Sequence, residues 1–167
     1  SATFEVFFRP TTLAGGGANQ RTLWETGGAT FGSGFTMDGS SIQFRAATEN
    51  VPGNVNNFAV ASFDISPYFN LDGSNSVDAG DFIHVVATMD VSQSGADALN
   101  LFINGRPVAA TKSVVGSPPN SAPWDWSGGN GAGVGANNSD VGGSDYTSSF
   151  QNPFGGDIAH FRLYGSS

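Results

Sequence analysis

Apolar and polar positions alternate along several short stretches of the chain. In the first stretch, Ala2 to Arg9, the residues Phe4, Val6 and Phe8 share one face, and Glu5, Phe7 and Arg9 share the other. Apolar positions recur with the same spacing from Leu99 to Ile103. A period of two is that of an extended chain with one face toward a core. Both stretches are therefore predicted β-strands.

Two dipeptides predict tight turns between such strands. Asn104-Gly105 follows the second stretch, and this pair supplies the two positive-φ positions of a type I′ turn. We therefore expect a β-hairpin from Leu99 to Ala110. Asp38-Gly39 joins two further short strands, Gly34 to Met37 and Ser41 to Ala47, as a second predicted hairpin.

Four more stretches have the pattern of strands: Arg21 to Thr26, Phe58 to Ile65, Phe82 to Asp90 and Gly156 to Tyr164. The third is apolar on both faces, which predicts a strand in the centre of its sheet. In the fourth, one face is predicted to carry Ile158, His160, Arg162 and Tyr164, and the other Asp157, Ala159, Phe161 and Leu163.

The longest irregular stretch runs from Lys112 to Phe154 and is rich in Gly, Ser, Asn and Pro, with one short strand expected near Ala132 to Gly135. Loops of this length in compact domains usually carry function or are disordered. No pattern predicts a helix of more than one turn. The fold class predicted is all-β, with two antiparallel sheets packed face to face as a β-sandwich.

Composition narrows the function classes. The 167 residues are enough for one domain, 1–167, with a core rich in its 14 Phe side chains. The formal net charge of −8 repels a phosphate backbone, so nucleic acid is excluded as a partner. The sequence contains no run of 18 apolar residues, so direct insertion into a membrane is not predicted. The chain has no cysteine, which excludes disulfides and thiolate zinc sites.

A set of short motifs occurs in a recognisable order: Phe4 to Pro10, Leu23 to Gly28, Phe82 to Asp90, Leu101 to Gly105 and Phe154 to Tyr164. Together they resemble a bacterial laminin-G-like domain of the concanavalin A-like jelly-roll superfamily. The resemblance implies a jelly-roll β-sandwich in a secreted or cell-surface protein. It leaves the function open, because that superfamily includes lectins, carbohydrate-binding modules, adhesion domains and glycoside hydrolases.

Such domains usually have one or two strands before the one that matches Ala2 to Arg9. The resemblance therefore implies that leading strands are missing or are supplied by another chain. In that case the first strand would have an unpaired edge, where a strand of another protein can add.

Catalysis is not predicted. Glycoside hydrolysis needs two carboxylates across the scissile bond, whereas Glu5, Glu25 and Glu49 are far apart and no strand carries an acidic pair at i, i+2. His84 and His160 lie inside predicted strands, where a hydrogen-bonded structural histidine is the ordinary role. No Gly-x-Ser-x-Gly nucleophile elbow accompanies them. The chain is therefore expected not to be an enzyme.

Calcium is the metal that the composition favours, because loops rich in Asp, Asn and Gly supply its oxygen ligands. The candidate ligands are Asp125, Asn130, Asp140, Asp145 and Asp157. In many relatives of the resembled family an acidic residue near the start of the last strand helps to hold calcium, and Ala159 occupies that position here. Asp157, two residues earlier, is expected to replace it.

Aromatic residues in the long irregular stretch indicate a carbohydrate site, because flat rings stack on sugars while Asp and Asn bond hydroxyls. The candidate ligand-binding residues are Trp124, Asp125, Trp126, Asn130 and Tyr146. The function predicted is a non-catalytic extracellular recognition module for a glycan or glycoprotein, assisted by calcium. The alternative is a structural or adhesive subunit that contacts other protein chains through an edge strand.

Overall fold

The computed structural model describes residues 1–13, 21–26, 32–47, 58–69, 81–115, 132–136 and 153–165. Its strands are β1 (Ala2–Pro10), β2 (Arg21–Glu25), β3 (Ser33–Asp38), β4 (Ser41–Ala47), β5 (Phe58–Asp64), β6 (Ile83–Met89), β7 (Leu99–Ile103), β8 (Arg106–Pro107), β9 (Thr111–Val115), β10 (Gly133–Val134) and β11 (Gly156–Gly165). The helical residues described form two 3-10 turns, η2 (Ser66–Tyr68) and η3 (Gly95–Ala98). Within the described ranges, no helix is long and apolar enough to cross a membrane.

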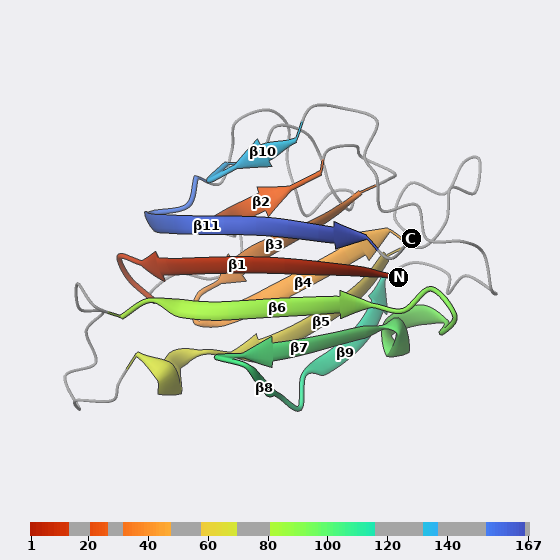
Figure 1. Ribbon diagram of the computed structural model, residues 1–167. Helices are drawn as coiled ribbons and strands as arrows, with labels where there is room; N and C mark the ends of the chain where they lie inside the picture. The colour runs from red at the N-terminus through yellow and green to blue at the C-terminus, as the bar shows by residue number, and fades with distance from the viewer. Residues whose placement is uncertain are drawn as a thin grey trace.

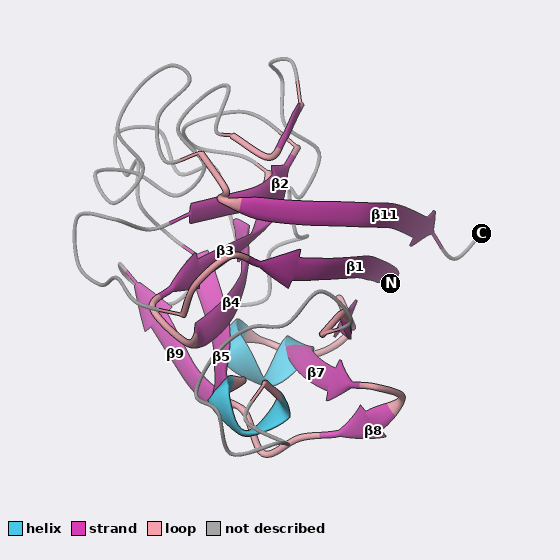
Figure 2. Cartoon of the chain, turned by 90° about the vertical axis from the view of Figure 1, so that its left-hand side faces the viewer, coloured by secondary structure: helices cyan, strands magenta, loops and turns pink. Residues whose placement is uncertain are grey.

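The strands form two antiparallel sheets. The five-stranded sheet has the order β11-β1-β6-β7-β8, and the six-stranded sheet has the order β10-β2-β3-β4-β5-β9. The five-stranded sheet lies in front of the six-stranded one in Figure 1. Figure 2, turned by 90°, separates the two layers. The predicted β-sandwich is confirmed.

The core lies between the inner faces of the sheets. Alternate residues of β1, from Phe4 to Phe8, are fully buried there. The Phe4 ring lies 4.6 Å from that of Phe44 on β4 and 5.6 Å from that of Trp24 on β2. These contacts join the two sheets, as expected when strands of period two bury one face against another sheet.

Both predicted hairpins are present. β3 pairs with β4 up to Asp38 opposite Ser41, and β7 pairs with the short strand β8. Asn104 and Gly105 have φ angles of 49° and 76°, the positive-φ pair that a type I′ turn requires.

The predicted facing of β11 is partly wrong, because the strand contains an irregularity. Its register against β1 shifts between Phe7, opposite His160, and Phe8, opposite Ile158, so that Ala159 is an extra residue. This is the arrangement of a β-bulge. It places Ile158 opposite the core residue Phe8, and Asp157 opposite Arg9, the reverse of what an unbroken alternation predicts.

Two further expectations are corrected. The irregular stretch does not begin at Lys112, because Thr111–Val115 forms β9 and pairs with β5. The first strand does not have an unpaired edge, because β1 pairs with β11 on one side and β6 on the other. The edges of that sheet, among the strands described, are β11 and β8. The short strand expected near Ala132 to Gly135 is present as β10.

Candidate functional site

Three neighbouring strands bring polar and aromatic side chains together on the outer face of the five-stranded sheet. β1 is the middle strand, and β6 and β11 lie on either side of it. In the register of the sheet, Phe7 is opposite His84 of β6 and also opposite His160 of β11. Because the neighbours of Phe7 on β1 point to the core, these three side chains share the outer face.

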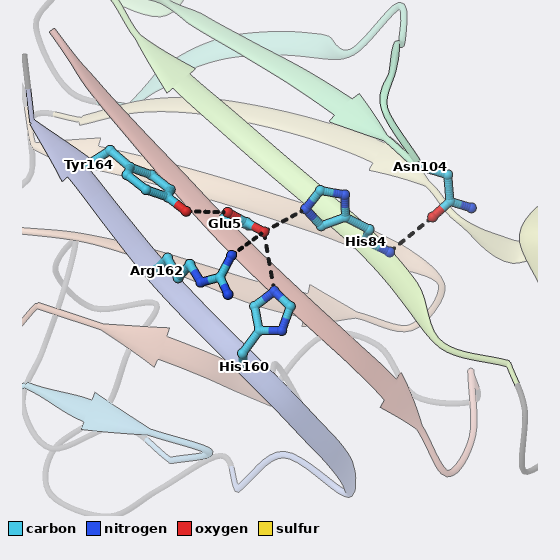
Figure 3. Close-up of polar contacts among 6 residues, drawn as sticks. All are labelled: Glu5, His84, Asn104, His160, Arg162 and Tyr164. Atoms are coloured by element: carbon cyan, nitrogen blue, oxygen red, sulfur yellow. Dashed lines mark hydrogen bonds and ion pairs between the residues drawn. The ribbon is translucent and has the colours of Figure 1, made fainter.

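Glu5 is the centre of a polar cluster on this face (Figure 3). His84 Nε2 lies 3.1 Å and His160 Nε2 3.2 Å from Glu5 Oε1. The Tyr164 hydroxyl donates a hydrogen bond to Glu5 Oε2 at 3.0 Å, and Arg162 Nη1 lies 3.8 Å from Oε1. We call these five residues the Glu5 cluster.

The cluster keeps its carboxylate ionised. Burial of the carboxyl opposes ionisation, yet hydrogen bonds from His160 and Tyr164 and the charges of His84 and Arg162 lower the pKa of Glu5 below its ordinary 4.5. Positive and hydrogen-bond-donating partners favour the charged form of an acid. Glu5 is therefore ionised at neutral pH, and because a carboxylate only accepts hydrogen bonds, the Nε2–H of each histidine is the donor.

The tip of the β7–β8 hairpin fixes the backbone of His84. The Asn104 N–H donates to the His84 carbonyl oxygen at 2.8 Å. In return, the His84 N–H donates to Asn104 Oδ1 at 3.0 Å, a bond that Figure 3 also shows. One turn residue thus holds His84 in place while β1 pairs with it from the other side.

Aromatic rings continue the site along the same face. The Phe7 ring stacks on Phe82 at 5.3 Å between centroids and on His160 at 5.6 Å. The Arg9 guanidinium carbon lies 5.5 Å from the centre of the Phe82 ring, within the range of a cation–π contact. The row orients the His160 ring and adds apolar surface beside the Glu5 cluster.

Asp157, a predicted calcium ligand, forms an ion pair with Arg9. Arg9 Nε donates to Asp157 Oδ2 at 3.0 Å, and Nη2 contacts the same oxygen. The close approach of the strands here depends on Gly156, whose φ is 155°. A Cβ atom at that position would lie 2.1 Å from the Arg9 carbonyl oxygen.

Within the described ranges, no group of three or more His, Cys, Asp or Glu side chains is arranged to hold a metal ion. The nearest approach to one is Glu5 with His84 and His160. There, however, the guanidinium of Arg162 already lies beside the shared carboxylate oxygen, and a cation would be repelled by it. The carboxylate acts as a hydrogen-bond acceptor.

The other predicted site residues lie outside the described residues: Trp124, Asp125, Trp126, Asn130, Asp140, Asp145 and Tyr146. The structure therefore neither brings them together nor separates them. The carbohydrate loop and the calcium site remain predictions.

Sequence reasoning did not connect the residues of the Glu5 cluster. It gave His84 and His160 a structural role within strands and treated Glu5 only as a carboxylate without a partner nearby in sequence. One signal was present: Glu5 and His84 each occupy polar positions that alternate with core residues, so both had to face outward. Their proximity depends on the pairing of strands 79 residues apart, which no local pattern encodes.

The chain is similar in fold to solved receptor-binding domains. That of botulinum neurotoxin mosaic serotype C/D matches with a TM-score of 0.45 and 11% identity, over 66% of this chain and 24% of that one. That of botulinum neurotoxin D matches with a TM-score of 0.44 and 12% identity, over 66% and 24%.

This chain thus spans about a quarter of the length of the solved domains that it matches. A likeness this weak carries no functional inference. No protein-family model matches the sequence, and no curated protein matches it, so the laminin-G-like resemblance remains a prediction. What is established is an all-β sandwich of two antiparallel sheets.

Proposed function

We propose that the chain is a non-catalytic binding module whose ligand is a carbohydrate, bound on the outer face of the five-stranded sheet. The observation that carries the proposal is the Glu5 cluster beside the aromatic row of Phe7 and Phe82. The network brings one carboxylate, two imidazoles, a phenol and a guanidinium together on the outer face of the sheet, beyond what the alternation of the strands requires. Ordered polar clusters of this kind are therefore candidates for function.

The chemistry of the face suits a sugar. Saccharides present hydroxyls that donate and accept hydrogen bonds, together with apolar ring faces. The cluster offers acceptors and donors from Glu5, His84, His160 and Tyr164. The half-buried ring of Phe82 offers apolar surface next to them. Small-ligand sites combine these same elements, apolar surface with a few placed polar groups.

Catalysis is not part of the proposal. Glycoside hydrolysis uses two carboxylates, and among the described residues Glu5 is the only carboxylate of the cluster. Asp157, the other carboxylate placed on this face, is held by Arg9.

The predicted loop residues extend the proposal. Trp124 and Trp126 are expected to add stacking surface. Calcium held by Asp125, Asn130, Asp140 and Asp145 is expected to order the loop. The laminin-G-like resemblance supports a secreted or cell-surface setting for such a module.

A glycan array with and without EDTA tests the proposal. The wild-type chain is expected to bind at least one glycan class. Phe82→Ala and Tyr164→Phe are expected to weaken that binding while the melting curve shows a folded protein. Val91→Ala is the control, because Val91 is exposed in the turn after β6, outside the cluster. If no glycan binds under either condition, the proposal is wrong.

Trp124→Ala and Trp126→Ala test the predicted loop separately. Weaker glycan binding with an unchanged melting temperature would support their role as ligand-binding residues. A large fall in melting temperature would instead assign both side chains to the core.

A second function, contact with another protein through an edge strand, is favoured by β11. This strand is an edge among the described strands, and it leaves Phe161 43% and Leu163 42% exposed. Edge strands with unpaired backbone groups are sites for strand addition, and exposed apolar side chains favour the contact. Light scattering tests this second function: Leu163→Lys is expected to reduce any association of the chain, and a wild-type chain that stays monomeric with every partner tried would contradict it.

A further inference from the structure

We infer that the ligand of the outer face is an acidic saccharide, one that carries a carboxylate or sulfate group, and that its binding tightens as the pH falls from neutral to mildly acidic. The inference rests on the proposed carbohydrate-binding function and adds to it the charge of the ligand and the control of its affinity.

Both histidines and two arginines gather on this face. The chain has a net charge of −8 with only 6 Lys and Arg residues and 2 His. His84 and His160 belong to the Glu5 cluster, and Arg9 and Arg162 lie on the same face. Once the histidines carry a proton, this face attracts an anion that the acidic chain otherwise repels.

The charges are layered so that the positive groups are outermost. The Glu5 side chain is only 15% exposed, whereas Arg162 is 57%, His160 37% and His84 32% exposed. A ligand that approaches the cluster thus meets donors, with the carboxylate beneath them. Arg162 is the most exposed of these groups, and a guanidinium binds carboxylate or sulfate oxygens through parallel N–H bonds.

Each arginine of the face has a carboxylate opposite it. Arg9 pairs with Asp157, and Arg162 faces Glu5, so these two pairs add no net charge. Protonation of His84 and His160 would add two positive charges beside them. The Tyr164 hydroxyl donates to Glu5. No other charged side chain is placed against the cluster by the described contacts of β1, β6 and β11.

Protonation also changes the hydrogen bonding that each ring offers. Because the Nε2–H of a neutral ring is directed to Glu5, Nδ1 is left as an acceptor. On protonation Nδ1–H becomes a donor, while the Nε2 contact is kept. Both rings thus change from acceptors that suit a hydroxyl to donors that suit an anion, without leaving Glu5.

The protonatable rings nearest to neutral pH all lie at this site. Histidine exchanges a proton near neutral pH more readily than the other side chains of a chain without cysteine. The 2 histidines of the chain both belong to the Glu5 cluster. A change of affinity that disappears when both are replaced is therefore a property of this site.

The experiment compares matched acidic and neutral saccharides at two pH values. The probes are a sulfated polysaccharide with its desulfated form, and polygalacturonate with its methyl ester, measured by titration calorimetry at about pH 7.5 and about pH 5.5. The sulfated probe keeps its charge at both values. We expect the acidic forms to bind more tightly than the neutral ones, and about tenfold more tightly at the lower pH.

Variants separate the site from the general charge of the chain. In the double variant His84→Gln, His160→Gln, the amides retain a donor toward Glu5 but do not titrate, and the ratio of the two Kd values should fall to about one. Arg162→Gln should weaken acidic ligands at both pH values. Arg106→Gln removes the same charge from β8, outside the cluster, and should leave both the preference and the ratio unchanged.

The outcomes distinguish the two proposals. If neutral and acidic forms bind equally, with no dependence on pH, the inference of an acidic ligand is wrong and the carbohydrate function stands. If the pH dependence persists in the double histidine variant, the assignment of the switch to His84 and His160 is wrong. If no saccharide of either kind binds, the proposed function fails with it.

Discussion

The two faces of β1 have the same backbone and opposite chemistry. Phe4, Val6 and Phe8 are fully buried against the second sheet, while Glu5 and Arg9 on the other face form ion pairs with side chains of β11 and β6. On the inner face the side chains must fill the space between the sheets, so replacing one by a smaller side chain leaves a cavity. On the outer face the side chains of β1 are held by partners from β6 and β11. These contacts form only when the three strands pair in the observed register.

The largest expected difference between the faces comes from removing one ring from each. Phe4→Ala should lower the free energy of unfolding by about 3–5 kcal/mol, because it empties a site between two sheets. Phe7→Ala should lower it by about 1–2 kcal/mol, because its ring is only half buried. Urea unfolding measures both values.

Thermal unfolding provides the check on this pair. Phe4→Ala is expected to reduce Tm by roughly 10 °C in a chain of this size. Equal losses for the two variants would mean that the outer aromatic row is part of the core, and the contrast between the faces would be broken.

A smaller effect is expected at the centre of the polar cluster. Glu5→Gln should lower stability by about 1 kcal/mol at neutral pH, because the charged acceptor of several hydrogen bonds is lost. The pKa of Glu5 is lowered in the folded chain from its ordinary 4.5. The stabilisation by its carboxylate is therefore complete above that value and is lost as the pH falls through the folded pKa.

The test is the difference in stability between wild type and Glu5→Gln as a function of pH. The difference should persist down to about pH 4.5 and shrink below it. Comparing the two chains removes the contribution of the other carboxylates. A difference that stays constant down to the lowest pH would contradict an ionised, stabilising Glu5.

The smallest effect is expected at the ion pair of Arg9 and Asp157, since both side chains are partly exposed. Asp157→Asn should change the free energy of unfolding by at most about 0.5–1 kcal/mol. Salt should reduce the difference from wild type, because it screens exposed charges. A loss above 2 kcal/mol, about twice that limit, would mean that Asp157 has a further role, such as the predicted calcium ligand.

Most of the sandwich could be predicted from local pattern. The alternation of β1 and the Asn104-Gly105 turn encode their own structure, because the period of two and the positive φ are properties of a few adjacent residues. The pattern did not reveal β9, where Thr111, Lys112 and Ser113 are polar. That segment is a strand because β5 offers it a partner.

The candidate site was harder to predict for the same physical reason. Glu5 and His160 are 155 residues apart, and their contact exists only because β1 and β11 pair in one register. Trp124 and Trp126 carried a clear compositional signal, but they lie outside the described residues.

The bulge in β11 marks the position at which this strand can lose a residue without a change of register. With Ala159 left out, Asp157, Ile158 and His160 would follow one another in perfect alternation, and each would keep its present partner on β1. The strand is thus a regular strand with one inserted residue, and its two halves are held by separate contacts. Deleting Ala159 should leave every other side chain of β11 on its present face of the sheet. The length of the strand can therefore change at this position without loss of the Glu5 cluster.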